Sequence, residues 1–464
     1  MLGKLLQPEV ASLVAARDFV RLREVFAEWD PVDLSEVIAD LPESDQVVIF
    51  RVLPQELAAD VFEYFEPDSQ QALLHSMGQE TAVRILNEMS PDDRTTLLEE
   101  LPPEAVKKLV ASLSASERQV AQALLGYPEG SVGRLMTPDF VAIKQDWTVQ
   151  RVLEHVRSRG RDSESLNVLY VLDQGGRLID DLRIREFLTC PLDTKVSDLL
   201  KDQFVSLSVT DNEENAVALF RKYDRTILPV VDTGGRLVGV VTVDDVLDVA
   251  EEAATEDIQK FGGLEAALDL PYMSSSFWDL FRKRGSCLVV LFLGEILTAS
   301  AMQYFQADID KETVLALFLP LVISSGGNSG SQSSTLVIRA MALGEVALQD
   351  WWRVARREIV AGISLGVLLG VVGYARILLW SMLGWDSGRY GAHPALLALS
   401  VSIALVGIVV WGSLSGAMCP FVLRICKLDP ATSSAPFVAT LVDVTGLIIY
   451  FVVVAAIFLP HTGH

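Results

Sequence analysis

The sequence has few of the residues that build zinc sites or disulfide frameworks. Its 464 residues include only four cysteines and five histidines. The cysteines form no CxxC pair, and the histidines form no cluster with the spacing of metal ligands. These absences argue against a structural zinc site and against a disulfide-bonded extracellular fold. The cysteine usage fits a reducing cytosol.

The N-terminal stretch lacks the features of a secretory signal. MLGKLLQPEVASLVAARD has a short apolar patch that charged residues interrupt. It has neither a continuous apolar core nor a small-residue cleavage site. We therefore expect the N-terminus to stay in the cytoplasm.

Basic residues are scarce in the first part of the chain, and charged residues of either sign are scarce in the last part. The formal net charge is −23, from 61 acidic and 38 basic residues. Residues 275–464 hold 11 of the acidic and 12 of the basic residues, which leaves 50 acidic and 26 basic residues for 1–274. The length suggests about three domains. The charge pattern indicates an acidic soluble region, where either solvation or cation binding would explain the charge.

A repeat of twelve residues runs through residues 1–128. Each unit offers a Pro, Ser or Gly helix start, acidic first-turn residues and then an apolar stripe. The spacing predicts an all-α superhelical domain of short stacked helices that share a continuous core. From the repeat alone, a purely scaffolding role is the favoured interpretation. The units begin at Leu41, Leu53, Phe65, Met77, Met89, Leu101 and Leu113.

Residues 129–250 change to an α/β texture. The order strand, helix, strand, turn, strand, helix is predicted twice, over 129–195 and 196–250. The segments MTPDFVAI and VVDTGGRLVGVVTVDDVL, together with the doubled arrangement, resemble a tandem pair of cystathionine-β-synthase (CBS) domains. Such pairs commonly bind adenine nucleotides between the repeats or act as ligand-gated dimerisation modules.

The CBS resemblance also implies nucleotide-binding residues. A Ser/Thr-x-x-Asp motif at the last strand-to-helix turn often holds the ribose, and Thr242 with Asp245 matches it in the second copy. The first copy has Arg183 and Glu186 in those places, so we expect at most one nucleotide per pair. Tyr170 is a further candidate contact. The alternative for Thr242 is a helix N-cap.

Five apolar runs after Ser275 are each long enough to cross a membrane. Basic residues flank alternate ends of these runs, in FRKR, WWRVARRE and LRICK. By the positive-inside rule this predicts a cytoplasmic N-terminus and a C-terminus on the opposite side, in agreement with an odd number of spans. The predicted spans cover 285–306, 313–341, 359–384, 393–423 and 434–459.

Polar residues interrupt three of the spans. The second contains SSGGNSGSQSST (324–335), and such a run is tolerated at membrane depth where it is buried in protein or lines a wet cavity. Close helix packing through small residues is the alternative. Asp443 lies in the middle of the fifth span, where a carboxylate usually marks an ion path, a relay or a partner. Glu295 in the first span is either a pore group or a packing or interfacial residue.

The full order of parts resembles the MgtE family of magnesium channels. The most specific stretches are GGNSGSQSSTLVIRA, ATLVDVTGLIIYF and TVDDVLDVAEEAATEDIQKFGG. The resemblance implies a connecting (plug) helix over 251–280 and a five-helix transmembrane domain over 281–464. It also implies a homodimer with one pore, lined chiefly by the second and fifth spans. Asp443 would be the main ion-binding carboxylate, with the backbone carbonyl of Ala439 and with Asn328 nearby. Mg²⁺ usually keeps several of its waters, so paired carboxylates could hold it hydrated.

The family also senses Mg²⁺ in its cytosolic region. Asn212, Ala253 and Ala435 depart from residues seen in relatives, which puts the full sensor set and the ion selectivity in doubt. A region with a net charge of −24 packs its acidic faces together only when cations neutralise the repulsion; a solvated acidic surface is the alternative. The sensing carboxylates implied by the resemblance are Asp60, Asp92, Asp93, Glu214, Asp224, Asp245, Asp248, Glu256 and Asp257.

These observations predict a multi-pass protein of the inner (plasma) membrane that is not an enzyme and binds no nucleic acid. Its predicted function is Mg²⁺-selective transport through a channel, gated by cytosolic Mg²⁺ and modulated by ATP. The alternatives are an ion-coupled carrier with broader selectivity (Mn²⁺, Co²⁺) and a non-transporting membrane CBS sensor. An intramembrane aspartyl protease needs two carboxylates that share a site. Asp443 is the only aspartate at the middle of a span, and five spans are too few for a CBS-bearing chloride channel.

Overall fold

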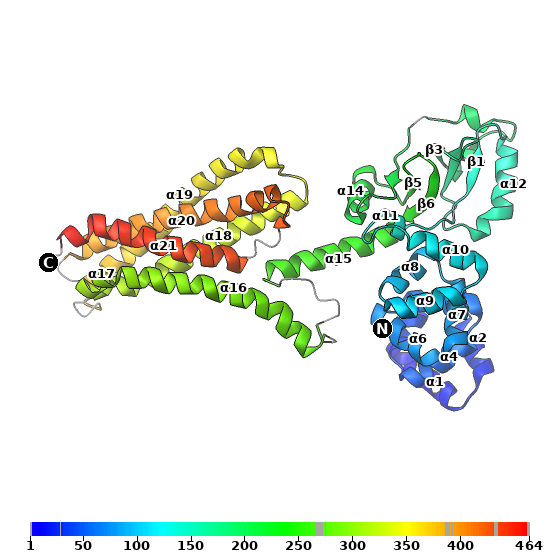
Figure 1. Cartoon of the computed structure of the whole chain (residues 1–464), viewed down its shortest axis with the longest axis horizontal. Coiled ribbons are helices and arrows are strands. Elements are labelled where there is room, and N and C mark those ends of the chain that lie inside the picture. The colour runs from blue at the N-terminus through cyan, green and yellow to red at the C-terminus, as the bar shows by residue number, and fades with distance from the viewer. Residues whose placement is uncertain are drawn as a thin grey trace. The chain divides into compact units, whose positions relative to one another are not determined.

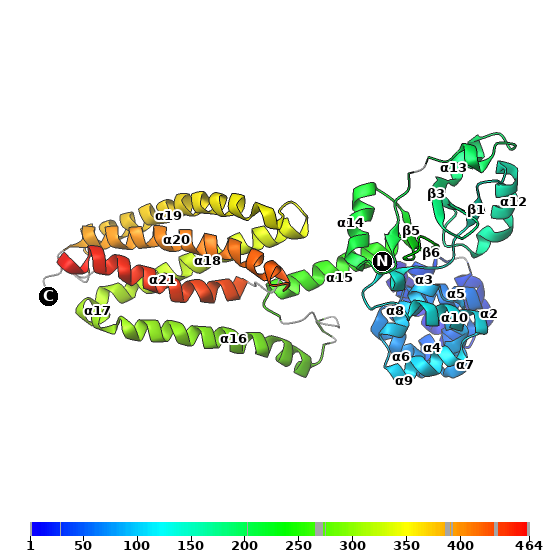
Figure 2. The same cartoon turned by 45° about the horizontal axis from the view of Figure 1, so that its top comes forward.

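The structure, a computed structural model, describes residues 2–27, 29–201, 203–264, 272–273, 275–385, 390, 393–430 and 435–461. It divides into two compact units, Met1–Glu252 and Ala253–His464, which Figures 1 and 2 show from two directions. Part of the predicted connecting helix (265–271 and 274), part of the loop before the fourth span and the first residue of the predicted fifth span lie outside the described residues.

The first unit begins with ten short helices, which confirms the all-α repeat (Figure 1). From α4 to α10 a new helix begins every twelve residues, always two residues after the start of a sequence repeat. The apolar residue that opens each repeat is at most 7% exposed, so these residues form the common core. The helices are α1 (Leu2–Ala15), α2 (Phe19–Phe26), α3 (Pro31–Ala39), α4 (Glu43–Val52), α5 (Gln55–Glu63), α6 (Pro67–Met77), α7 (Gln79–Glu88), α8 (Pro91–Glu99), α9 (Pro103–Ser112) and α10 (Ala115–Leu124).

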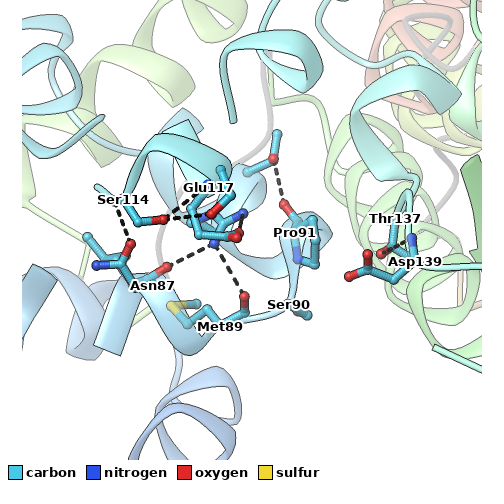
Figure 3. A network of polar contacts seen from close by, with 12 residues as sticks. Asn87, Met89, Ser90, Pro91, Ser114, Glu117, Thr137 and Asp139 are labelled. Carbon is cyan, nitrogen blue, oxygen red and sulfur yellow. Dashed lines mark hydrogen bonds and ion pairs between the residues drawn. The ribbon is translucent and has the colours of Figure 1, made fainter. Parts of the chain in front are cut away.

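Polar contacts tie α7, α8 and α10 together, as Figure 3 shows for Asn87, Ser114 and Glu117. Arg94 of α8 is fully buried, and its Nη2 lies 2.7 Å from Glu117 Oε2. Its Nη1 donates to the carbonyl oxygen of Leu86 at 3.0 Å. The backbone N–H of Ser114 donates to Asn87 Oδ1 at 2.8 Å. These contacts hold the loop between α7 and α8 in place. They also fix the positions of Asp92 and Asp93, which follow it in the first turn of α8.

Two three-stranded sheets follow the helical repeat. In each sheet the first two strands are parallel and the last two antiparallel, which confirms the twice-repeated order. Apolar side chains of β2, β3, β5 and β6 pack into one shared cluster between the sheets. The first copy has α11 (Val132–Leu135), β1 (Ala142–Lys144), α12 (Val149–Arg159), β2 (Val168–Leu172), β3 (Leu178–Arg183) and α13 (Ile184–Thr189); the second has β4 (Leu207–Ser208), α14 (Glu213–Tyr223), β5 (Ile227–Val231), β6 (Leu237–Thr242) and the start of α15 (Val243–Phe261).

The predicted connecting helix is not a separate element. α15 begins directly after β6 and continues without a break to Phe261. The last helix of the second CBS repeat and the first part of the predicted connection are therefore one helix of 19 residues, because no Gly or Pro interrupts its sequence.

Among its described residues, the second unit contains five helices that are long and apolar enough to cross a membrane, as predicted. The first and third begin eight residues before the predicted spans, because their basic, aromatic starts continue the helix beyond the apolar stretch. The run 324–335 is fully helical. The helices are α16 (Phe277–Tyr304), α18 (Leu319–Ala342), α19 (Trp351–Met382), α20 (Pro394–Ile425) and α21 (Ala435–Ile457), with the short α17 (Gln306–Lys311) after α16.

Glycines set the distance between α18 and α20. A methyl group at Gly412 would lie 2.4 Å from the carbonyl oxygen of Gly326, and one at Gly416 would lie 2.0 Å from that of Gly330. Ser329 and Ser413 share a hydrogen bond of 2.7 Å in the same contact. These glycines therefore serve close helix packing, the alternative interpretation of the polar run.

Candidate functional site

The membrane unit has an acidic pocket between α16 and α21, two helices that run side by side in Figures 1 and 2. Its volume is about 620 Å³. Asp443 and Thr440 of α21 and Glu295 of α16 are its polar residues, and Ala439 also lines it. Because this pocket lies within helices of membrane-spanning length, its carboxylates stand where a charged side chain usually serves an ion path, a relay or a partner. The remaining lining residues are Leu288, Val289, Leu291, Phe292 and Pro436.

Around Asp443, some side chains of α21 pack into the core of the helix bundle and others line the pocket. Val438 and Val442 are fully buried against the bundle, whereas Asp443 is half-buried. The hydroxyl of Thr440, one turn earlier, donates to the carbonyl oxygen of Pro436 at 3.1 Å. The helix therefore exposes one polar edge toward α16 while its apolar face remains in the core.

The second span, α18, lies close to Asp443 at Gly327. A methyl group at Gly327 would lie 3.5 Å from Asp443 Oδ1 and 3.3 Å from the Cβ of Ala439. The neighbouring Asn328 is exposed, and its amide donates to Ser324 Oγ at 3.3 Å. The structure thus brings Asp443 and Ala439 together at one pocket, and among the described lining residues Asn328 is not included.

The first unit has a second acidic site, where carboxylates of α5, α8 and α15 converge. The backbone N–H of Ser90 donates to Glu63 Oε1 at 2.7 Å, and its hydroxyl donates to Asp93 Oδ2, also at 2.7 Å. Thr242 Oγ1 donates to Asp245 at the start of α15. We call Glu63, Asp92, Asp93 and Asp245 the acidic cluster.

Mutual repulsion and burial raise the pKa values of this cluster. Loss of hydration is the largest cause for each group, followed among the charges by a neighbouring carboxylate. The pKa of Glu63 is raised to about 8, with Asp93 beside it, and the pKa of Asp245 is raised to about 8, with Asp92 beside it. The pKa of Asp93 is raised to about 6. Burial also raises the pKa of Asp92. The site is thus short of positive charge.

The other predicted sensing residues are not members of this cluster: Glu214 and Asp224 lie at the ends of α14, and Asp60 and Asp248 lie at the edge of the cluster. Glu214 and Asp224 stand at opposite ends of α14, an 11-residue helix, so they are about 15 Å apart along its axis. Asn212 caps that helix, and its Oδ1 accepts a hydrogen bond from the backbone N–H of Glu214 at 2.8 Å. Asp60 and Asp248 lie at the edge of the cluster, where their charges act on Glu63 and Asp93 respectively.

Glu256 and Asp257 belong to the other unit. Lys260 lies 2.7 Å from Glu256 Oε1 and 2.7 Å from Asp429 Oδ2, which joins the end of α15 to the segment between α20 and α21. The ion pairs of Lys260 therefore link the end of α15 to the segment that precedes α21.

Sequence reasoning missed two members of the acidic site. Glu63 is the last residue of α5, and Glu164 lies in the loop before β2; the charges of Asp92, Asp93 and Asp244 raise the pKa of Glu164 after its loss of hydration. The spacing of Asp60 and Glu63, three residues apart on one helix, could have revealed the first of them. Within the described residues, no three His, Cys, Asp or Glu side chains form a ready-made metal site.

The predicted nucleotide residues come from both CBS copies: Tyr170 lies in β2 of the first, and Thr242 and Asp245 lie where β6 leads into α15 in the second. Tyr170 is 1% exposed and packs edge-on against Phe140, with ring centroids 6.1 Å apart. Beside it, Arg225 Nη1 lies 3.0 Å from Asp181 Oδ2. Asp245 instead belongs to the acidic cluster, where a triphosphate would meet negative charge.

The fold and the two acidic sites define a class: a multi-pass membrane protein with a helical-repeat and CBS unit and a five-helix unit that carries a carboxylate pocket. Family models match both units. Residues 319–453 match the MgtE divalent cation transporter model, 29–130 the MgtE intracellular N domain, and 132–193 and 196–252 the CBS domain. The chain belongs to the MgtE family.

Relatives cover almost the whole chain. The magnesium transporter MgtE of Thermus thermophilus is 39% identical over 432 residues, which are 92% of this chain and 93% of that protein. The magnesium transporter MgtE of Bacillus subtilis is 31% identical over 440 residues, covering 95% and 94%.

Solved structures resemble the first unit. The cytosolic domain of the Mg²⁺ channel MgtE in complex with ATP has a TM-score of 0.50 at 34% identity and covers 53% of this chain and 100% of that one. The soluble part of a magnesium transporter has a TM-score of 0.52 at 27% identity and covers 54% and 99%.

Proposed function

We propose that this protein transports Mg²⁺ across the cell membrane through a pore in its five-helix unit. The observation that carries the proposal is the position of Asp443: a half-buried carboxylate, in the middle of a membrane-spanning helix, that lines a pocket. A charge in that position costs about 2.5–3.5 kcal/mol on insertion scales, so it is retained where it serves an ion path. The names of the relatives, which are magnesium transporters, support Mg²⁺ as the cargo.

The pocket also supports a homodimer. It opens on the α16 and α21 side of a single chain, and Glu295 there is exposed. Exposing two carboxylates to lipid would carry a large free-energy cost, because lipid does not hydrate charged groups. A second copy on the same face would enclose the opening and place two copies of Asp443 around one path. Two symmetry-related carboxylates can hold a hydrated dication that keeps most of its waters.

Gating by cytosolic Mg²⁺ is the second part of the proposal. The acidic cluster has carboxylates as its neighbouring charges, and such a group holds together when protons or cations reduce the repulsion. Mg²⁺ at this cluster would stabilise the packing of the helical repeat on the CBS pair. Because α15 carries Asp245 in its first turn and Lys260 in its last, it is the element that would carry the change to the pocket helix. In this arrangement the unit with the cluster and the N-terminus faces the cytoplasm.

ATP is a further ligand that we propose for the CBS pair, on the support of the ATP complex of a relative's cytosolic domain. The buried position of Tyr170 argues that a nucleotide would contact other residues in this chain. Equilibrium dialysis of ATP against the purified protein, with and without Mg²⁺, tests this proposal independently of transport.

Flux in liposomes tests the transport proposal. The purified protein is reconstituted around a Mg²⁺-sensitive dye, and Mg²⁺ entry is followed after its addition outside. Asp443→Asn keeps the size of the side chain and removes its charge, so the fold should survive and the flux should collapse. Asp443→Glu should retain part of the flux, and Asp310→Asn, an exposed carboxylate outside the pocket, should match the parent. Parent-like flux through Asp443→Asn would show that Asp443 is a packing residue.

A second-ion gradient separates a channel from a coupled carrier. Flux through a channel depends on the Mg²⁺ gradient and the membrane potential alone. If Mg²⁺ entry instead required a proton or Na⁺ gradient, the carrier alternative would replace the channel. If the parent moved no divalent cation at all, the non-transporting sensor would replace both.

A further inference from the structure

Glu295 of α16 is the second carboxylate of the membrane pocket. Its carboxyl group and that of Asp443 lie within hydrogen-bonding reach of each other. The nine described lining residues include no Lys, Arg or His that could balance the two charges. When both groups are ionised, they repel one another in a medium of low dielectric constant. The chain therefore places two negative charges together where a cation would be needed to stabilise them.

A close helix contact fixes the distance between these two residues. A methyl group at Gly294 would lie 2.5 Å from the side-chain methyl carbon of Thr440, so the close approach of α16 and α21 at this point depends on a glycine. Glu295 is the next residue after that glycine, and Asp443 lies one turn beyond Thr440. The contact thus holds one carboxylate on each side of the opening.

Burial in protein does not explain why α16 carries Glu295. The helix is the least buried of the five apolar helices, and its neighbours Phe292, Leu293 and Ile296 are exposed apolar side chains suited to lipid. A packing role would place Glu295 against polar partners from the other helices, yet the partner that the structure gives it is another carboxylate. The pair makes sense when a dication lies between the two groups.

We propose that Glu295 is a second ion-binding residue of the pore, which accepts hydrogen bonds from the waters of the hydrated divalent cation that Asp443 attracts. This inference rests on the proposed transport function. Mg²⁺ gives up its waters reluctantly, so a pocket of about 620 Å³ with a carboxylate on each side suits the hydrated ion better than the bare one. Two fixed charges also favour a dication over a monovalent cation, because the attraction scales with the charge of the ion.

The test compares Glu295→Gln and Glu295→Asp with the parent in the liposome assay, over a range of Mg²⁺ concentrations and with K⁺ flux measured in parallel. Glu295→Gln should raise the half-saturating Mg²⁺ concentration about tenfold and raise K⁺ flux relative to Mg²⁺ flux. Glu295→Asp should restore most of the affinity because the charge returns. Glu345→Gln, the same change at an exposed loop residue, should behave as the parent.

The outcomes separate this inference from the proposed function. If Glu295→Gln keeps the parent's half-saturating concentration and ion preference while Asp443→Asn abolishes flux, Glu295 is a packing residue and only this inference fails. Equal losses of maximal flux in Glu295→Gln and Glu295→Asp, with unchanged half-saturation, would also overturn it. If Asp443→Asn conducts as the parent does, the pore assignment itself fails. The thermal unfolding midpoint of each purified variant must match the parent for the comparison to count.

Discussion

Asp92 of α8 and Asp245 of α15 lie close enough for the charge of Asp92 to raise the pKa of Asp245, although about 150 residues separate them in the chain. One residue belongs to the helical repeat and the other to the second CBS copy. Their electrostatic interaction therefore couples the packing of two domains to the charge state of these carboxylates.

The pH dependence of that packing is the first prediction. The pKa values of Glu63 and Asp245 are about 8 in the folded unit and near 4 in an unfolded chain, and that of Asp93 is about 6. The folded unit thus binds more protons between these values, so its stability should fall as the pH rises from about 5 to about 8. Limited proteolysis of the full protein without Mg²⁺ should be faster at the higher pH. Saturating Mg²⁺ should remove most of the difference, and an equal rate at both pH values without Mg²⁺ would contradict the prediction.

Neutralising the cluster is the second prediction. Combining Asp92→Asn, Asp93→Asn and Asp245→Asn removes the repulsion that Mg²⁺ would otherwise offset, so the unit should resist protease without Mg²⁺ and respond little to its addition. The matched control removes three charges from exposed positions by Asp33→Asn, Asp68→Asn and Asp146→Asn. The control should keep the parent's response to Mg²⁺, and a control that lost it would assign sensing to the overall charge of the unit.

The third prediction concerns the contact between α18 and α20. Gly412→Ala places a methyl group 2.4 Å from a backbone oxygen of α18, which cannot move aside as a flexible side chain can. We expect a loss of about 1–3 kcal/mol in stability and a lower thermal unfolding midpoint in detergent. Gly285→Ala, where nothing lies within 4 Å, is the control and should leave the midpoint unchanged or higher. Equal midpoints for the two variants would mean that the helices separate at little cost.

The fourth prediction concerns the buried arginine of the repeat. Arg94→Ala leaves the carbonyl oxygens of Leu86 and Met89 and the carboxylate of Glu117 without their donor. The loss should be about 2–3 kcal/mol and should appear as faster proteolysis of the first unit. Because α8 carries two members of the acidic cluster, the Mg²⁺ concentration needed for protection should also rise. Lys107→Ala, an exposed basic residue on α9, is the control.

Local patterns were enough to predict most of the fold. The twelve-residue period set the start of seven helices because a Pro, Ser or Gly start and a buried apolar residue recur in every unit. Apolar length predicted five membrane-spanning helices, and the position of Asp443 within the last one predicted a site there. These properties depend on neighbours along the chain, which a sequence displays directly.

Only the tertiary structure decided which distant carboxylates meet. Glu63 looks like an ordinary surface residue at the end of a helix until the packing of α8 against α5 places it beside Asp92 and Asp93. The sequence leaves Glu295 open to a packing or a pore role, and only the structure shows that the close approach at Gly294 places it beside Asp443. The glycines of α18 are another example. The sequence shows that they are there, but only the structure shows that Gly412 and Gly416 of α20 lie against their carbonyl oxygens. Electrostatic interaction and close contact depend on distances in space, and those distances are fixed only when helices far apart in the chain pack together.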